Sequence, residues 1–258
     1  MKSILAILAS VTAASACIYG RAEDAGSHAA AWSYDGVNGP LMWHTLDAKN
    51  AACADGKHQS PIDIDSATIQ HGSEAELLWP STGSFNLTNN GHTVEAIPGG
   101  KYVSRLGGRE EFTLRNFHFH ASSEHTVDGL VYPLEAHFVH QSDAGNYAVV
   151  GVFFEVERRG SPFFRSMDFE QLQEKDDKVE ILDLNLEPII KQVGDVFTYA
   201  GSLTTPPCSE GISWFVEKKP LTISAAQYKQ IRRAMGYNAR FTQGVPGEEN
   251  LLAMVKRS

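Results

Sequence analysis

Short apolar or alternating segments, separated evenly by glycine and proline, make up most of the chain. Six of them have the length of a β-strand, and several alternate with a period of two residues, which is typical of strands with one buried face. Residues 147–154 are continuously apolar, as expected of a strand that is buried on both faces. The six predicted strands are 85–87, 92–97, 112–120, 134–140, 147–156 and 211–216.

Helical patterns are few. Ser224 and Gln227 have the spacing of a capping box, and the helix that they begin is expected to end at Gly236. A second short helix is predicted over residues 187–193. We find no internal repeat and no low-complexity linker. The chain is therefore predicted to be mainly β, with a large sheet and short peripheral helices in a single domain over residues 17–258.

The first 16 residues have the features of a secretory signal peptide. Lys2 precedes a short apolar core, and Ala14, Ser15 and Ala16 match the small-residue rule for cleavage. Cleavage after Ala16 would place Cys17 first, but a lipoprotein signal usually has Leu where Ala14 stands. We therefore predict a secreted protein, periplasmic if the source is a bacterium. No later stretch is expected to span a membrane.

The composition excludes some partners and leaves three cysteines to explain. The formal net charge is -9, from 31 acidic and 22 basic side chains, and no cluster of Lys and Arg occurs. This balance argues against nucleic acid and against an anionic membrane surface as partners. An oxidising compartment would permit Cys53 and Cys208 to pair.

Half of the ten histidines lie between residues 118 and 140. His118 and His120 share one face of a predicted strand, because side chains two residues apart point the same way. The next predicted strand carries His137, and an antiparallel return would bring it beside the pair. Three imidazoles with an open fourth position are typical of a catalytic zinc site. Histidines that are hydrogen-bonded inside a core are the alternative interpretation.

Carboxylate and amide oxygens accompany these histidines. Glu135 shares a face with His137, and Asn116 shares a face with His118, so each can accept the remaining ring N–H. We expect His125 and His140 to make structural hydrogen bonds and not to bind the metal.

Several further motifs accompany the histidines along the chain. They are Phe117-His118-Phe119-His120, 123–129, 135–140, Gln59-Ser60-Pro61, Asn89-Asn90-Gly91-His92, 199–208 and Asn238-Ala239-Arg240. Taken together, these motifs resemble the α-class carbonic anhydrases, in particular the secreted members. The resemblance extends over residues 31–243, and departs from the usual pattern at Asn116, where Gln is common, and at Ala121, where Trp is common.

The resemblance implies a mostly antiparallel sheet of about ten strands around a conical cavity that contains zinc. It implies reversible hydration of CO2 to bicarbonate and a proton, by attack of a zinc-bound hydroxide. The implied site residues are the zinc ligands His118, His120 and His137, the second layer Asn116, Glu135 and Asn238, the catalytic residues Glu124, Thr204 and the proton shuttle His92, the substrate pocket Val139, Val149, Leu203, Thr205 and Trp214, and the disulfide pair Cys53 and Cys208.

Two other functions are weighed beside this one. A cupin-type metalloenzyme would use Glu124 as a fourth ligand, but the second half of the cupin motif is lacking. The other alternative is a secreted binding or storage protein on the same fold, with little catalytic activity. The expected partners are CO2 and bicarbonate, and the expected state is a monomer or homodimer.

Overall fold

The structure is a computed structural model that describes residues 31–66, 70–108 and 110–255. The predicted leader and Cys17 lie outside the described residues. Within them, no helix has the length and apolar character needed to cross a membrane.

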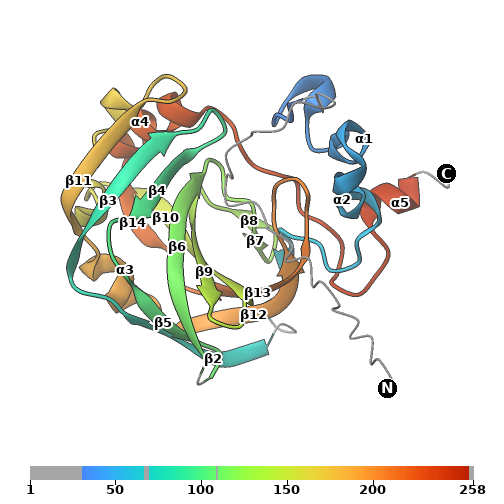
Figure 1. The fold of residues 1–258 in the computed structure, drawn as a ribbon, viewed down its shortest axis with the longest axis horizontal. Coiled ribbons are helices and arrows are strands. Elements are labelled where there is room, and N and C mark those ends of the chain that lie inside the picture. The colour runs from blue at the N-terminus through green and yellow to red at the C-terminus, as the bar shows by residue number, and fades with distance from the viewer. Residues whose placement is uncertain (1–30, 67–69, 109, 256–258) are drawn as a thin grey trace, which may run out of the picture.

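One large sheet of eleven strands runs through the molecule (Figure 1). Ten strands follow the order β11-β3-β4-β6-β5-β2-β12-β13-β10-β14, and β9 pairs with both β6 and β10. Every pairing is antiparallel except those of β10 with β13 and β14. The predicted architecture is therefore confirmed. The strands are β2 (Gln70–Leu78), β3 (Thr82–Asn89), β4 (Val94–Pro98), β5 (Val103–Leu106), β6 (Glu111–His120), β9 (Leu134–Ser142), β10 (Tyr147–Glu157), β11 (Lys178–Asn185), β12 (Asp195–Ser202), β13 (Glu210–Glu217) and β14 (Leu221–Ser224).

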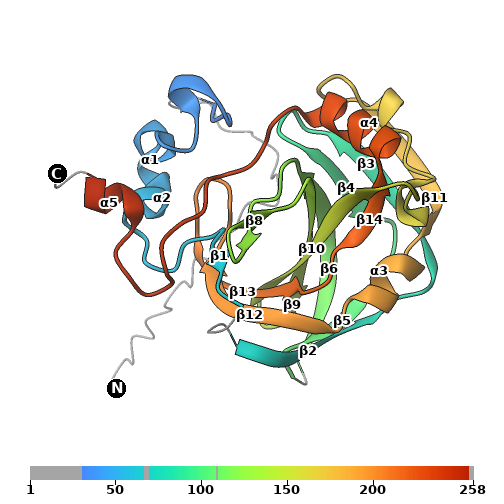
Figure 2. The same ribbon diagram turned by 180° about the vertical axis from the view of Figure 1, so that it is seen from behind.

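Short elements surround this sheet. Helices α1, α2 and α5 lie together on one flank, whereas α4 lies at the opposite end of the molecule (Figures 1 and 2). A small second sheet joins three two-residue strands. The short elements are β1 (Asp63–Ile64), β7 (Thr126–Val127), β8 (Leu130–Val131), α1 (Trp43–Leu46), α2 (Ala52–Asp55), α3 (Glu187–Gln192), α4 (Ala225–Met235), α5 (Leu251–Val255) and the 3-10 turns Gly36–Asn38, Ala48–Asn50, Pro162–Phe164 and Phe169–Gln171.

All six predicted strands occur, as β3, β4, β6, β9, β10 and β13, and both predicted helices occur, as α3 and α4. The prediction missed β2, β5, β11, β12 and β14 of the large sheet. It also began β4 two residues early, at His92. Residues 90–93 instead form a turn, because the side chain of Asn90 accepts hydrogen bonds from the backbone N–H groups of His92 and Thr93.

Helix α4 begins with the predicted capping box. The Ser224 hydroxyl accepts from the backbone N–H of Gln227, and the Gln227 side chain accepts from the Ser224 N–H. The helix ends at Gly236, whose φ of 69° is readily adopted by glycine. From the last turn, Arg232 donates to the carbonyl of Ala121, directly after the second histidine of β6. The helix thus supports the strand end that carries the site.

The core lies on the face of β6 opposite to the histidines. Phe117 and Phe119 point into it and are fully buried with Phe85, Phe138 and Phe163. Their rings contact one another at centroid distances of 5.1 to 6.5 Å. Burial of each such side chain contributes about 1.5–3 kcal/mol. This packing fixes the strand whose other face holds the candidate site.

A disulfide joins Cys53 of α2 to Cys208, which lies in the loop before β13. The pairing that the resemblance implied is therefore confirmed. The bond links positions 155 residues apart and is completely buried against Trp43. It therefore attaches the α1–α2 flank to the loop that carries Leu203, Thr204 and Thr205.

Candidate active site

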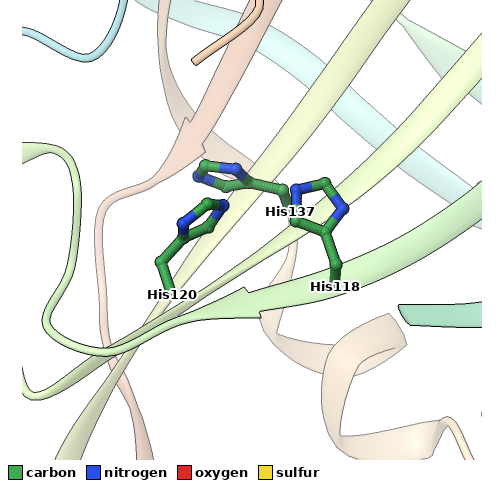
Figure 3. A group of neighbouring side chains, drawn as sticks. All are labelled: His118, His120 and His137. Atoms are coloured by element: carbon green, nitrogen blue, oxygen red, sulfur yellow. The ribbon is translucent and has the colours of Figure 1, made fainter. Parts of the chain in front are cut away.

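The pairing of β6 with β9 brings three histidines together. The strands are antiparallel, and His118 lies directly opposite His137. The ring centroids are 5.1 Å apart for His118 and His120, 5.4 Å for His118 and His137, and 4.5 Å for His120 and His137. The rings converge (Figure 3), and one nitrogen of each lies within 4.8 Å of the others. The donor set can hold a metal ion.

The remaining nitrogen of each ring faces a hydrogen-bond acceptor. Nδ1 of His118 lies 3.1 Å from Oδ1 of Asn116, and Nδ1 of His120 lies 2.8 Å from the carbonyl oxygen of Asn238. Nε2 of His137 lies 2.7 Å from Oε1 of Glu135. Since an acceptor requires a proton on its partner, these nitrogens carry the N–H. Lone pairs remain on Nε2 of His118, Nε2 of His120 and Nδ1 of His137, which one cation can share.

The two asparagines act from different parts of the chain. Asn116 is one methylene shorter than the usual Gln, yet it reaches His118, and the ladder between β6 and β9 is irregular between Leu114 and Asn116. Asn238 is completely buried beyond α4. Its backbone oxygen accepts from His120, its side-chain oxygen accepts from the Ala121 N–H, and its side-chain amide donates to the carbonyls of His92 and Phe119.

Glu135 is a completely buried carboxylate with four donors around it. Oε1 lies 2.7 Å from both Nε2 of His137 and Nδ1 of His125, and Oε2 accepts the backbone N–H groups of Glu124 and His125. Burial by itself would raise the pKa of Glu135, but its electrostatic interactions and hydrogen bonds with His125 and His137 hold it well below its usual range. The ionised form fixes the N–H of His137 on Nε2.

His125 extends this network away from the cavity. Its Nε2 lies 2.6 Å from the Tyr199 hydroxyl, which in turn lies 2.7 Å from Oγ of Ser60. His140 lies among the core side chains, where its ring nitrogens bond to Ser104 and to the carbonyl of Phe138. Both histidines make the structural hydrogen bonds that were expected of them.

The three converging rings are held in the neutral form. Burial and the neighbouring rings of His120 and His137 lower the pKa of His118 well below its usual value. Burial also lowers the pKa of His120 to about 3, and it lowers that of His137 against the opposing effect of Glu135. Neutral imidazole is the form that binds metals.

Beneath the histidines lies Glu124, which is also completely buried. Oε1 accepts the backbone N–H of Arg240 at 2.8 Å. Burial raises the pKa of Glu124 well above its usual value, against hydrogen bonds from Arg240 and from the Thr204 side chain. Oε2 lies 3.4 Å from Nε2 of His120, and that nitrogen is buried without a hydrogen-bond partner. Buried polar atoms rarely lack a partner, so this nitrogen suits a cation.

A cavity adjoins these groups. All five residues predicted for the substrate pocket line it, together with Thr204 and the three converging histidines. Val149 of β10 lies opposite Trp214 on the parallel strand β13. On its other side, Val149 lies opposite Val139 on the antiparallel strand β9. The lining side chains are Tyr34, His92, Thr93, Glu95, Asn116, His118, His120, His137, Val139, Tyr147, Val149, Leu203, Thr204, Thr205 and Trp214.

His92 also lines the cavity, on the turn that precedes β4. Gly91, with a φ of 86°, makes the turn, and the His92 ring stacks on Trp32 at a centroid distance of 3.8 Å and an angle of 7°. Burial, and to a smaller extent the charge of Lys175, lowers the pKa of His92. The ring therefore lines the same cavity as the histidines of β6 but lies at a half-buried position.

Sequence reasoning missed four of the lining residues: Tyr34, Thr93, Glu95 and Tyr147. Glu95 lies opposite His118 on β4, and burial raises the pKa of its carboxyl to about 7. One acidic residue in an otherwise apolar strand was the available indication for Glu95. The other three become visible only when the strands are assembled.

Comparison with known proteins agrees with this geometry. The family model of eukaryotic-type carbonic anhydrase matches residues 38–251. A carbonic anhydrase of Nostoc sp. is 36% identical over 218 residues, which is 82% of each chain. The solved fungal α-carbonic anhydrase of Aspergillus oryzae is 35% identical with a TM-score of 0.82, over 88% of this chain and 99% of that one. A structure of dioscorin complexed with ascorbate is 30% identical with a TM-score of 0.76, over 83% of this chain and 94% of that one. The chain belongs to the eukaryotic-type, or α, carbonic anhydrase family.

Proposed function

We propose that this protein catalyses the reversible hydration of CO2 to bicarbonate and a proton, with one zinc ion held by His118, His120 and His137. The observation that carries the proposal is the set of three hydrogen bonds to Asn116, Asn238 and Glu135. These bonds leave one lone pair on each ring, and the ring nitrogens converge within 4.8 Å.

The donor set fits zinc. Three neutral nitrogen ligands leave the full charge of the ion to act on a fourth position, as in catalytic zinc sites. When bound, zinc would supply a hydroxide at neutral pH, for which carbonic anhydrase is the standard example. The carboxylate of Glu135 supports His137 from behind, so it orients the ring without neutralising the ion directly.

Thr204 and Glu124 would orient the nucleophile. Thr204 lowers the pKa of Glu124, and its hydroxyl would donate to that carboxylate, which leaves the Thr204 oxygen available only as an acceptor. A hydroxide that donates its single hydrogen to Thr204 must direct its lone pairs elsewhere. CO2 has no polar handle, and the apolar wall of Val139, Val149 and Trp214 suits it. CO2 held against this wall would lie beside the hydroxide that zinc would supply, and its hydration would give bicarbonate.

His92 would transfer the proton to solvent. An imidazole titrates close to neutral pH, so it can both accept and donate a proton in turnover. The ring lines the cavity but is only half-buried, which allows it to exchange protons with water on either side. Replacement of His92 by Ala is expected to slow turnover, and imidazole buffer is expected to restore part of the rate.

We further propose that the mature protein acts outside the cytoplasm, after removal of residues 1–16. The disulfide between Cys53 and Cys208 supports this location, since such bonds persist in oxidising compartments. The substrate and product would be CO2 and bicarbonate.

A binding or storage function on the same fold is the alternative, and the dioscorin structure with ascorbate illustrates it. The complete set of oriented histidines favours catalysis. A cupin-type enzyme is not favoured, because the fold is that of the carbonic anhydrases.

The test is stopped-flow CO2 hydration, with zinc measured on the same samples before and after chelation. We expect about one zinc per chain, loss of activity with loss of zinc, and recovery when zinc is restored. A zinc-loaded protein with only the background rate of hydration would contradict the proposal and favour the binding function.

A further inference from the structure

Thr93 occupies the junction between the proposed proton shuttle and the histidine strand. It follows His92 directly and is almost completely buried. The backbone ladder between β4 and β6 contains only two residue pairs, Glu95 with His118 and Ala96 with Phe117. Because β4 begins at Val94, the ladder ends at the pair of Glu95 with His118, and Phe119 has no residue of β4 as its partner.

The Thr93 hydroxyl makes the hydrogen bonds to Phe119 that a residue of β4 would otherwise make. Oγ1 donates to the carbonyl of Phe119 at 2.6 Å and accepts the backbone N–H of Phe119 at 3.2 Å. Both polar groups of Phe119 are therefore satisfied by one side chain. Phe119 is the residue between His118 and His120, so this bond acts on the backbone that spaces two of the converging rings.

A second side chain completes the same connection. The Asn238 amide donates to the carbonyl of Phe119 at 2.8 Å and to the carbonyl of His92 at 3.1 Å. The residue at position 92 and the residue at position 119 are thus joined twice, once through Thr93 and once through Asn238. No bond in this connection passes through a metal ion or a substrate.

We infer that Thr93 is a positioning residue, whose hydroxyl sets the placement of His92 relative to the histidines of β6. This inference rests on the proposed function, in which His92 transfers the proton. Removal of the hydroxyl leaves the Phe119 N–H without its partner. It also removes one of the two connections between the His92 turn and β6. The rings of His118 and His120 keep their own acceptors, so the metal site itself should change less than the path of the proton.

The chain offers a matched pair of substitutions. Thr93→Val keeps the size and shape of the side chain but removes both hydrogen bonds, whereas Thr93→Ser keeps the hydroxyl. Steady-state hydration kinetics separate the two stages, because kcat includes proton transfer to solvent and kcat/KM reports conversion of CO2 to bicarbonate. Zinc content and the midpoint of thermal unfolding are measured on the same preparations.

We expect Thr93→Val to lower kcat by about 10–100-fold, because a misplacement of 1 Å can cost about a hundredfold in rate, and to leave kcat/KM near the wild-type value. Thr93→Ser should restore kcat, and concentrated imidazole should rescue Thr93→Val. If Thr93→Val changes only the unfolding midpoint, or lowers kcat and kcat/KM equally, the inference is wrong. A wild-type protein without CO2 hydration would instead contradict the proposed function, so the two failures can be distinguished.

Discussion

The two faces of strand β6 carry side chains of opposite character. On one face the rings of Phe117 and Phe119 pack against other aromatic rings and are fully buried. On the other face His118 and His120 converge with His137, and each ring is held by a specific oxygen atom. On one face of the strand, packing of side-chain volume holds the residues in place. On the other face, specific hydrogen bonds hold them in place.

This difference shows how the strand can serve both stability and chemistry. A core face tolerates changes of shape as long as its volume is filled. A face of oriented rings depends on which nitrogen carries the proton, and a single lost acceptor changes that. Substitutions on the core face should therefore lower stability first, and those on the histidine face should lower metal affinity first.

The largest expected effect is on the histidine face. Replacement of His120 by Ala removes a completely buried ring that contributes one of three lone pairs, so we expect zinc to be lost and CO2 hydration to fall to the background rate. Metal analysis and stopped-flow kinetics measure this. The control is His140→Ala, an identical change on the core side of β9, which should lower stability but retain zinc. Equal zinc loss in both variants would contradict the separation of the two faces.

On the core face, replacement of Phe119 by Ala should lower the free energy of unfolding by about 3–5 kcal/mol, because a cavity forms among the aromatic rings. Urea unfolding of the metal-free protein measures this change. The fraction that remains folded should still bind zinc. A loss of zinc affinity as large as that of His120→Ala, without loss of stability, would mean that the faces are not independent.

A smaller effect is expected behind the metal site. Glu135→Gln keeps the shape of the side chain but removes the charge that fixes the N–H of His137. We expect zinc affinity to fall by about 10–100-fold, which is typical of such supporting groups. Competition with a chromophoric chelator provides the measurement, and Glu157→Gln, exposed at the end of β10, is the control. An unchanged affinity would show that Glu135 does not support the ring.

Within a single pH unit, the smallest effect concerns the core histidine. Burial lowers the pKa of His140 to about 4, below its value of about 6.5 in an unfolded chain. Because the folded pKa is the lower one, the stability from the neutral ring is complete above pH 6.5. It is lost as the pH falls toward 4, by about 1.4 kcal/mol per pH unit. His140→Gln should remove this part of the slope in urea unfolding of the metal-free protein, whereas an unchanged slope would contradict the burial argument.

The sequence predicted the elements whose patterns are local. The alternation of Phe and His in β6 identifies both faces at once, and the spacing of Ser224 and Gln227 identifies the start of α4. The histidine trio follows from this alternation and one antiparallel return. Strand β11 was missed because it carries several exposed polar residues, and β12 was missed because its sequence has no strict alternation.

Contacts between distant segments could not be predicted from the pattern. Asn238 meets His120 across 118 residues, and Thr93 meets Phe119 across 26. The parallel pairing of β10 with β13 and β14 likewise depends on assembly of the whole sheet. The family resemblance supplied Asn238 and the disulfide partner, whereas Glu95 and Thr93 required the structure.

The central claim is that hydrogen bonds to Asn116, Asn238 and Glu135 select which nitrogen of each histidine binds the metal. A crystal structure of the zinc-loaded protein tests it directly. We expect bonds of about 2.0–2.1 Å to the ion from Nε2 of His118, Nε2 of His120 and Nδ1 of His137, with the three hydrogen bonds kept. An ion bound through Nε2 of His137, or placed between His125 and Glu135, would contradict it.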